Sequence, residues 1–162
     1  MLGKPRFAAP LAALIQVLHQ RAQTLSIAES CTGGLLSAQL TSFPEVSKVF
    51  LGGVVSYSNE SKQNLLDVPG PLIKAAGAVS TPVALAMARG VREKFQSSWS
   101  ISVTGIAGPS GGTPQKPVGT VCFAVLGPGI VESCTEVFSG ARSEIQNSSA
   151  EFAVEFLTKF MK

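Results

Sequence analysis

The stretch TLSIAESCTGGLLSAQLT, residues 24–41, predicts the class of fold. Residues 24–28 are a short apolar run typical of a strand, and residues 29–34 form a turn of small and polar side chains. The sequence of residues 35–41 favours a helix. A strand that passes through a tight polar turn into a helix is the building unit of α/β proteins. We therefore expect a chain of the α/β class.

The sequence on both sides of this stretch extends the pattern. Gly52-Gly53 indicates a bulge or a close backbone approach within a strand. Gly127-Pro128-Gly129 is short enough to join two strands as an antiparallel hairpin. Because the other strands are separated by helices, we expect a mixed β-sheet in one domain over residues 1–162. Besides residues 24–28 and 35–41, strands are predicted over residues 49–57, 99–103, 118–126 and 130–138, and helices over residues 10–23, 58–66, 72–76, 80–95 and from about 142 onward.

The composition excludes several kinds of site. With 45% hydrophobic residues, 14% charged residues and a formal net charge of +3 over 162 residues, the chain predicts a well-packed domain without the basic surface of a nucleic-acid-binding protein. His19 is the only histidine and Asp67 the only aspartate, so a Ser-His-Asp triad would need that pair. Neither a His-rich zinc site nor an Asp-based magnesium site can be built. We expect no metal and no cofactor.

The cysteines indicate the compartment. Cys31, Cys122 and Cys134 contain no CxxC pair, and an odd number is a poor disulfide framework. This usage favours a reduced, cytoplasmic setting. No segment reaches the roughly 18 apolar residues that a membrane-spanning helix needs, so we expect no membrane partner.

Polar turns of small residues follow the first three predicted strands. They cover residues 29–34, 57–62 and 104–117. In open α/β sheets, ligands bind beyond the carboxyl ends of the strands. We therefore expect these three segments to converge on one site.

Ser30 is the candidate nucleophile in the first turn. Thr32, Gly33 and Gly34 follow it, and free N–H groups at the start of the next helix are expected to hold an oxyanion or a phosphate. Alternatively, Ser30 or Thr32 only caps that helix. Cys31 is a second candidate nucleophile because a helix N-terminus lowers a thiol pKa, although a buried, small hydrophobic role is also open.

Lys62 is the candidate general base for Ser30. Ser58 is a suitable N-cap and places Lys62 in the first helical turn, where the helix dipole disfavours a cation by roughly 0.3–1 kcal/mol. Partial burial would also be needed to give a neutral amine near pH 7. A neutral lysine can accept the proton of a serine hydroxyl. The alternatives are a solvated surface lysine, with Glu29 or Glu60 as a carboxylate base.

The third turn and the last helix add candidate binding groups. The loop GIAGPSGGTP, residues 105–114, matches neither Walker A nor the dinucleotide fingerprint. Its glycines, including Gly105 and Gly108, allow backbone N–H groups to approach an anion or a flat ring. Thr104 could donate a hydroxyl hydrogen bond into the same space. Arg142 could grip a phosphate bidentately, or form a surface ion pair.

Several of these segments closely resemble the C-terminal domain of the bacterial competence/damage-inducible protein CinA. Stand-alone members of that family are nicotinamide-nucleotide amidases, also called NMN deamidases. We expect the short, stand-alone form, without a molybdopterin-binding-like domain. The similarity covers nearly the whole chain from Leu11 onward in the same order, through AESCTGG at 28–34, GVVSY at 53–57 with Asn59 and Lys62, GAVS at 77–80, and VTGIAGP at 103–109 through GTV at 119–121.

The resemblance implies a single compact α/β/α sandwich, usually in a homo-oligomer. It implies hydrolysis of the carboxamide of nicotinamide mononucleotide (NMN) to nicotinate mononucleotide and ammonia, a reaction of pyridine nucleotide recycling. Ser30 matches the family's nucleophile and Lys62 its base, while Tyr57, Thr104 and Arg142 match positions that shape the site or hold the substrate. We therefore expect a catalytic set of Ser30, Lys62, Tyr57 and Thr104, and a substrate-binding set of Thr32, Gly33, Gly34, Gly105, Gly108 and Arg142.

The sequence departs from the family pattern near the last helix. The family often has Gly-Asp-Arg with a further arginine one turn later, whereas this chain has Gly140-Ala141-Arg142 and then Gln146. The departure concerns the substrate more than the acyl chemistry. Two other functions stay open from the sequence: a non-catalytic nucleotide-binding or interaction module, and an amidohydrolase acting on a related amide.

Overall fold

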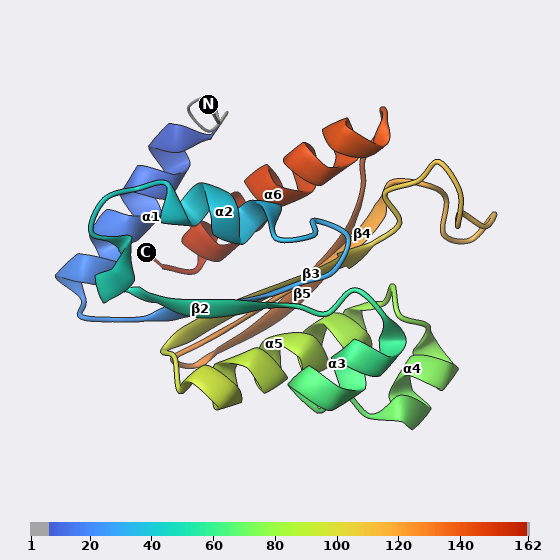
Figure 1. Cartoon of the computed structure of the whole chain (residues 1–162), viewed down its shortest axis with the longest axis horizontal. Coiled ribbons are helices and arrows are strands. Elements are labelled where there is room, and N and C mark those ends of the chain that lie inside the picture. Colours follow the sequence, from blue (N-terminus) through green and yellow to red (C-terminus); the bar gives the residue numbers. More distant parts are fainter. Residues whose placement is uncertain (1–6, 162) are drawn as a thin grey trace.

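A computed structural model describes residues 7–161 and shows three layers (Figure 1). In this range β1 pairs in parallel with β2 and with β3, whereas β3–β4 and β4–β5 are antiparallel. The expected α/β class and mixed sheet are confirmed. Residues 1–6 and 162, which the predicted domain includes, lie outside the described residues. The sheet order is β2-β1-β3-β4-β5, from strands β1 (Leu25–Glu29), β2 (Phe50–Val55), β3 (Trp99–Gly105), β4 (Thr120–Gly127) and β5 (Ile130–Val137).

Helices cover both faces of the sheet (Figure 1). A 3₁₀ turn, η1 (Val46–Lys48), precedes β2. The predicted elements correspond to observed ones, with ends that differ by a few residues because terminal turns fray. One face carries α1 (Ala8–Gln20), α2 (Leu35–Thr41) and α6 (Arg142–Lys159), and the other carries α3 (Asn59–Leu66), α4 (Gly70–Ala76) and α5 (Thr81–Phe95).

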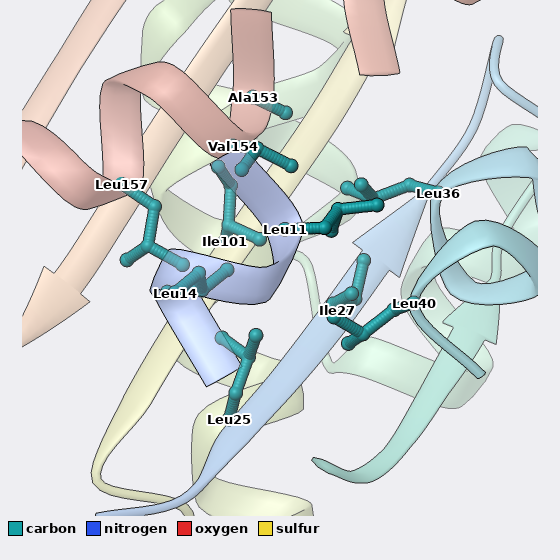
Figure 2. A pocket seen from close by; sticks show the side chains of 10 residues that line it. All are labelled: Leu11, Leu14, Leu25, Ile27, Leu36, Leu40, Ile101, Ala153, Val154 and Leu157. Carbon is teal, nitrogen blue, oxygen red and sulfur yellow. The ribbon is translucent and has the colours of Figure 1, made fainter. Parts of the chain in front are cut away.

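The larger apolar core lies between the sheet and α1, α2 and α6. Figure 2 shows aliphatic side chains from all three helices and from β1 and β3 that surround a small gap. No polar atom lines the gap, so it belongs to the packing of the core. The lining residues are Leu11, Leu14, Leu25, Ile27, Leu36, Leu40, Ile101, Ala153, Val154 and Leu157.

Strand β2 contains the irregularity that its two glycines predict. Leu25 pairs with Phe50 but Ser26 pairs with Gly52, so the register shifts by one residue there. A Cβ at Gly52 would lie 2.4 Å from the ring of Phe95 on α5. Glycine is therefore required where α5 approaches this strand.

The carboxyl ends of β1, β2 and β3 meet at one edge of the sheet because these strands run parallel. The turns after them, residues 29–34, 57–62 and 104–117, start from that edge. Their predicted convergence follows from this topology, and the antiparallel hairpin of β4 and β5 extends the other side of the sheet.

Candidate active site

Ser30 lies directly after β1 at the carboxyl edge of the sheet. Its backbone N–H donates to the carbonyl of Val103 in β3 at 2.9 Å. The neighbouring strand therefore holds the backbone that carries the Ser30 hydroxyl. The N-cap of α2 is Gly34, and neither the Ser30 nor the Thr32 side chain accepts an N–H of this helix, so the interpretation of Ser30 or Thr32 as a helix cap is wrong.

Lys62 is positioned by the start and the packing of α3. The predicted cap forms: Ser58 Oγ accepts from the N–H of Ser61 at 3.0 Å, and Ser61 Oγ accepts from the N–H of Ser58 at 3.0 Å. At its other end, α3 packs closely on α5, where a Cβ at Gly90 would lie 1.9 Å from the carbonyl oxygen of Leu66. Lys62 lies one turn before Leu66 on the same helix face, so this contact turns its side chain inward.

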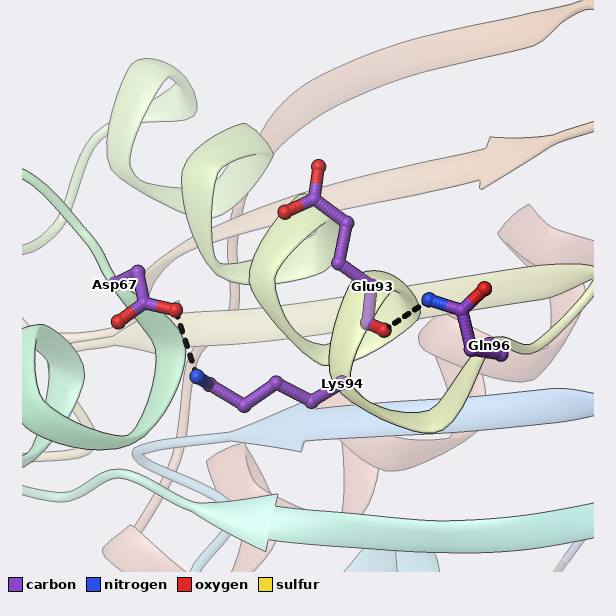
Figure 3. A network of polar contacts seen from close by, with 4 residues as sticks. All are labelled: Asp67, Glu93, Lys94 and Gln96. Atoms are coloured by element: carbon purple, nitrogen blue, oxygen red, sulfur yellow. Dashed lines mark hydrogen bonds and ion pairs between the residues drawn. The ribbon is translucent and has the colours of Figure 1, made fainter.

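An exposed ion pair also joins α3 to α5 (Figure 3). Lys94 Nζ lies 2.6 Å from Asp67 Oδ2, and Gln96 Nε2 donates to the carbonyl of Glu93 at 2.6 Å. Exposed pairs contribute about 1 kcal/mol or less. This pair therefore adds little to the packing of α3 on α5.

The Lys62 amine contacts the Ser30 hydroxyl inside the protein. Lys62 Nζ lies 2.9 Å from Ser30 Oγ and 2.7 Å from the carbonyl oxygen of Ser56. Lys62 is 1% exposed and Ser30 is 6% exposed. The interpretation of Lys62 as a solvated surface lysine is therefore wrong.

Burial changes the charge of Lys62. Both of its hydrogen-bond partners are neutral, and burial lowers the pKa of Lys62 from 10.5 to about 8. At pH 7 a pKa of 8 leaves about one amine in ten neutral, against roughly one in three thousand for a pKa of 10.5. A buried lysine of this kind is a competent proton acceptor for an adjacent serine.

Glu29 has a structural role that sequence reasoning missed. Its carboxylate accepts hydrogen bonds from the N–H groups of Gly34, Leu36 and Ser37 at 3.1, 3.1 and 2.9 Å, and from Ser37 Oγ at 2.6 Å. The start of α2 is thereby filled by a protein carboxylate, so the expectation that this helix end holds an oxyanion is wrong. Both oxygens of the Glu29 carboxylate are bonded at the start of α2 and not to Ser30. Glu60, the other candidate carboxylate base, is exposed. An acidic residue just before a helix is the signal that indicates this role.

The turn between Ser30 and α2 contains two backbone N–H groups that donate to no carbonyl. The N–H of Gly33 donates to the carbonyl of Ser30 at 3.0 Å, and that of Gly34 to Glu29. Within residues 7–161, the N–H groups of Cys31 and Thr32 donate to no backbone carbonyl, and the group that they approach is the adjacent Cys31 thiol, whose pKa they lower slightly against the larger effect of burial. The candidate oxyanion donors are therefore those of Cys31 and Thr32 instead of those of Gly33 and Gly34. The Thr32 hydroxyl is buried and likewise has no partner in this range.

Cys31 is unsuited to act as a nucleophile. Burial raises the pKa of its thiol to about 12, and the thiolate is the reactive form. We expect Cys31→Ser to react with a fluorophosphonate, a reagent for activated serines, within about threefold of the wild-type rate, because the change leaves Ser30 and Lys62 in place. A loss of more than about 100-fold in the labelling rate of a folded Cys31→Ser protein would contradict this assignment.

Arg142 joins two of the turns at the sheet edge. Its Nη1 donates to the carbonyl of Gly108 at 2.7 Å, and its Nη2 donates to Tyr57 Oη at 2.6 Å. No ion pair involves Arg142 among the described residues, so the surface ion-pair interpretation is wrong. Tyr57 is 59% exposed, which places this cluster at the solvent side of the site.

Thr104 and Gly105 lie at the end of β3 and pack against neighbouring segments. Thr104 is buried and its Oγ1 donates to the carbonyl of Ala78 at 2.9 Å, so the expected donation into the site is wrong. A Cβ at Gly105 would lie 2.7 Å from the side chain of Val121. The Thr104 hydroxyl therefore joins β3 to the segment before α5, and the lack of a side chain at Gly105 allows β3 to pack closely on β4.

Two further findings concern residues 7–161 as a whole. They contain no group of three or more His, Cys, Asp or Glu side chains arranged to hold a metal ion. None of their helices combines the length and the apolar character needed to cross a membrane.

The chain is similar to one well-defined group of proteins. The family model of the CinA C-terminal domain matches residues 8–161. A CinA-like protein of Parasynechococcus marenigrum is 56% identical over 133 residues, which is 82% of this chain and 32% of that protein. One from Prochlorococcus marinus is 49% identical over 150 residues, 91% of this chain and 36% of that protein. The chain spans about a third of the length of these curated relatives.

Solved structures give the same result. The competence/damage inducible protein CihA from Agrobacterium tumefaciens has a TM-score of 0.92 and 33% identity, and the match covers 95% of this chain and 94% of that one. A competence-damaged protein (CinA) superfamily protein from Escherichia coli also has a TM-score of 0.92, with 31% identity over 99% of this chain and 93% of that one.

Proposed function

The chain belongs to the CinA C-terminal domain family, and we propose that it is an amidohydrolase that converts NMN to nicotinate mononucleotide and ammonia. The observation that carries this proposal is the 2.9 Å contact between Ser30 Oγ and Lys62 Nζ in a buried setting. A hydroxyl paired with a base is the arrangement of nucleophilic catalysis. The resemblance of the sequence to nicotinamide-nucleotide amidases supplies the substrate.

The first step is activation of Ser30. One amine N–H of neutral Lys62 donates to the Ser56 carbonyl, which leaves the lone pair able to face Ser30 Oγ. Lys62 accepts the hydroxyl proton while Ser30 Oγ forms a bond to the carboxamide carbon. Charge then develops on the carboxamide oxygen, next to the N–H groups of Cys31 and Thr32. One preorganised donor of this kind contributes about 10²–10³ in rate.

The second half of the reaction returns both residues to their starting state. Lys62 gives its proton to the amide nitrogen, the C–N bond breaks and ammonia leaves the nicotinoyl ester on Ser30. Water then attacks the ester carbon and loses a proton to Lys62. When the carboxylate product leaves, Ser30 Oγ takes that proton back from Lys62. One water is therefore consumed for each amide hydrolysed.

The Arg142 cluster is the proposed binding site for the phosphate of NMN. A guanidinium carries the only side-chain charge of the cluster formed by Tyr57, Gly108 and Arg142, and its planar geometry suits two phosphate oxygens. To bind both, Arg142 must exchange its contacts with Gly108 and Tyr57 for the ligand. This places the phosphate at the solvent side and the carboxamide toward Ser30.

We expect Arg142→Ala to raise the KM for NMN by about 10- to 100-fold, because a hydrogen bond to a charged group contributes about 1.5–3 kcal/mol. Nicotinamide riboside lacks the phosphate, so its KM should be unchanged by the substitution. Arg89→Ala, on the exposed side of α5, is the control for loss of one positive charge. Equal effects of Arg142→Ala on the nucleotide and the riboside would exclude phosphate binding by Arg142.

The test of the proposed function is ammonia release from NMN by the purified chain, compared with nicotinamide and nicotinamide riboside. Stoichiometric ammonia and nicotinate mononucleotide are expected. Faster hydrolysis of another amide would show that NMN is not the preferred substrate, while the proposed hydrolysis by Ser30 and Lys62 would stand. Binding of NMN without release of ammonia would instead favour a non-catalytic nucleotide-binding module.

A further inference from the structure

Gln146 on α6 contacts the turn that follows Ser30. Its Nε2 donates to the backbone carbonyl of Cys31 at 2.9 Å, across 115 residues of sequence. The Cys31 carbonyl and the Thr32 N–H belong to one planar trans peptide, in which the two point in opposite directions. A hydrogen bond from α6 to that carbonyl therefore directs the Thr32 N–H away from α6. Lys62 comes from α3 in the opposite layer (Figure 1).

The preceding peptide is anchored in the same way. The Ser30 carbonyl accepts the N–H of Gly33 at 3.0 Å, which fixes the plane that contains the N–H of Cys31. Both peptides after the Ser30 side chain thus have a bonded carbonyl, while within residues 7–161 their N–H groups donate to no carbonyl and approach only the weakly accepting Cys31 thiol. One anchor is local to the turn, and the other depends on a single side chain from α6.

We propose that Gln146 is a positioning residue that fixes the Thr32 N–H as an oxyanion donor. This inference rests on the proposed nucleophilic role of Ser30. Donors accelerate a reaction when they are held in place before charge develops, and a hydrogen bond accepted by the carbonyl of a peptide strengthens the donation by its N–H. Removing the Gln146 amide allows the Cys31–Thr32 peptide to rotate and weakens the donor without touching Ser30 or Lys62.

The experiment measures how fast a fluorophosphonate labels Ser30, beside ammonia release from NMN. In labelling, Ser30 Oγ forms a bond to phosphorus, fluoride leaves, the proton passes to Lys62, and charge develops on the phosphoryl oxygen. The labelling rate therefore reports the oxyanion donors even if NMN is not the substrate. The variants are Gln146→Leu and Gln146→Glu, which lack the donor, and Gln146→Arg, which keeps N–H groups. Asn147→Ala is the matched control, since its amide bonds only to Ser143 on the exposed side of α6.

We expect the Leu and Glu variants to label about 10- to 100-fold more slowly and to lose kcat for NMN by the same factor, with KM within twofold. Gln146→Arg should stay within about fivefold of wild type, and Asn147→Ala should match it. The apparent pKa of labelling should not change in Gln146→Leu, because Lys62 is unaltered and the substitution adds no charge near it. Wild-type labelling rates in both Gln146→Leu and Gln146→Glu would overturn the inference, as would an equal loss in Asn147→Ala or a shifted pKa in Gln146→Leu. Labelling of Ser30 without ammonia release would overturn only the proposed substrate.

Discussion

Replacing Ser30 by alanine is expected to lower the rate of ammonia release from NMN by about 10⁴-fold or more, because removal of a nucleophile that acts together with its base abolishes covalent catalysis. Binding of NMN should change by less than about threefold, since Arg142 and the loop near Gly108 are untouched. The measurement is steady-state ammonia release combined with calorimetric titration of NMN. Loss of activity with retained binding would separate a chemical role of Ser30 from a structural one.

The control for this substitution is Ser42→Ala. Ser42 is an exposed serine just beyond α2 whose hydroxyl donates to the carbonyl of Gln39, so its loss should leave the rate unchanged. If Ser30→Ala kept more than about a tenth of the wild-type rate, the serine mechanism would be wrong and direct attack by water would have to be considered.

Replacing Lys62 by methionine is expected to lower the activity and to raise the stability of the folded protein. The rate of ammonia release should fall by about 10²–10⁴-fold, the usual contribution of a general base. The folded protein should nevertheless become more stable at pH 7, because methionine fills similar space without a buried amine. A base that is costly to bury and is retained beside Ser30 is consistent with a role in the reaction.

The direction of the stability change follows from the pKa of Lys62. Burial lowers it from 10.5 to about 8 in the folded protein, so between these values the unfolded chain binds more protons and the free energy of unfolding rises with pH. Below pH 8 the full cost of burying Lys62 applies, roughly 3 kcal/mol for this pKa shift. Lys62→Met removes this cost, but it also loses the hydrogen bonds to Ser30 and Ser56, which offsets part of the gain in stability. We expect Lys62→Met to add about 1–3 kcal/mol at pH 7.

Denaturant unfolding at several pH values measures this effect. The advantage of Lys62→Met should shrink from pH 8 upward and vanish above about pH 10.5. Lys94→Met is the matched control, because Lys94 forms the exposed pair with Asp67 in Figure 3 and its loss should destabilise by about 1 kcal/mol or less. A Lys62→Met protein that is less stable than wild type at every pH would indicate that the lysine serves structure.

Much of the fold was predictable because its signals are local. The polar turn at residues 29–34, the Ser58 cap and the short link between β4 and β5 each specify a nearby element. The strand order was not predictable, because it depends on how α2 and the helices from α3 to α5 return the chain to the sheet. The contact of Gly90 with Leu66 likewise joins distant segments.

In the candidate site, too, some features could be predicted from local sequence and others depend on distant segments. Ser30 and Lys62 could be selected from residue type and from their places after two parallel strands, and the structure brings their side chains together. The role of Glu29 at α2 and the donation of Thr104 to Ala78 depend on which way a side chain points. The contact of Gln146 with Cys31 depends on a helix 115 residues away. Sequence patterns do not contain such orientations.

The pH dependence of ammonia release from NMN shows directly whether a neutral Lys62 acts on Ser30. Wild-type kcat/KM should rise tenfold per pH unit below about pH 8 and level off above it, since burial lowers the pKa of Lys62 to about 8. The residual activity of Lys62→Met should lack this step. The same step with the same midpoint in wild type and Lys62→Met, or a flat profile from pH 6 to 9 in both, would exclude Lys62 as the base.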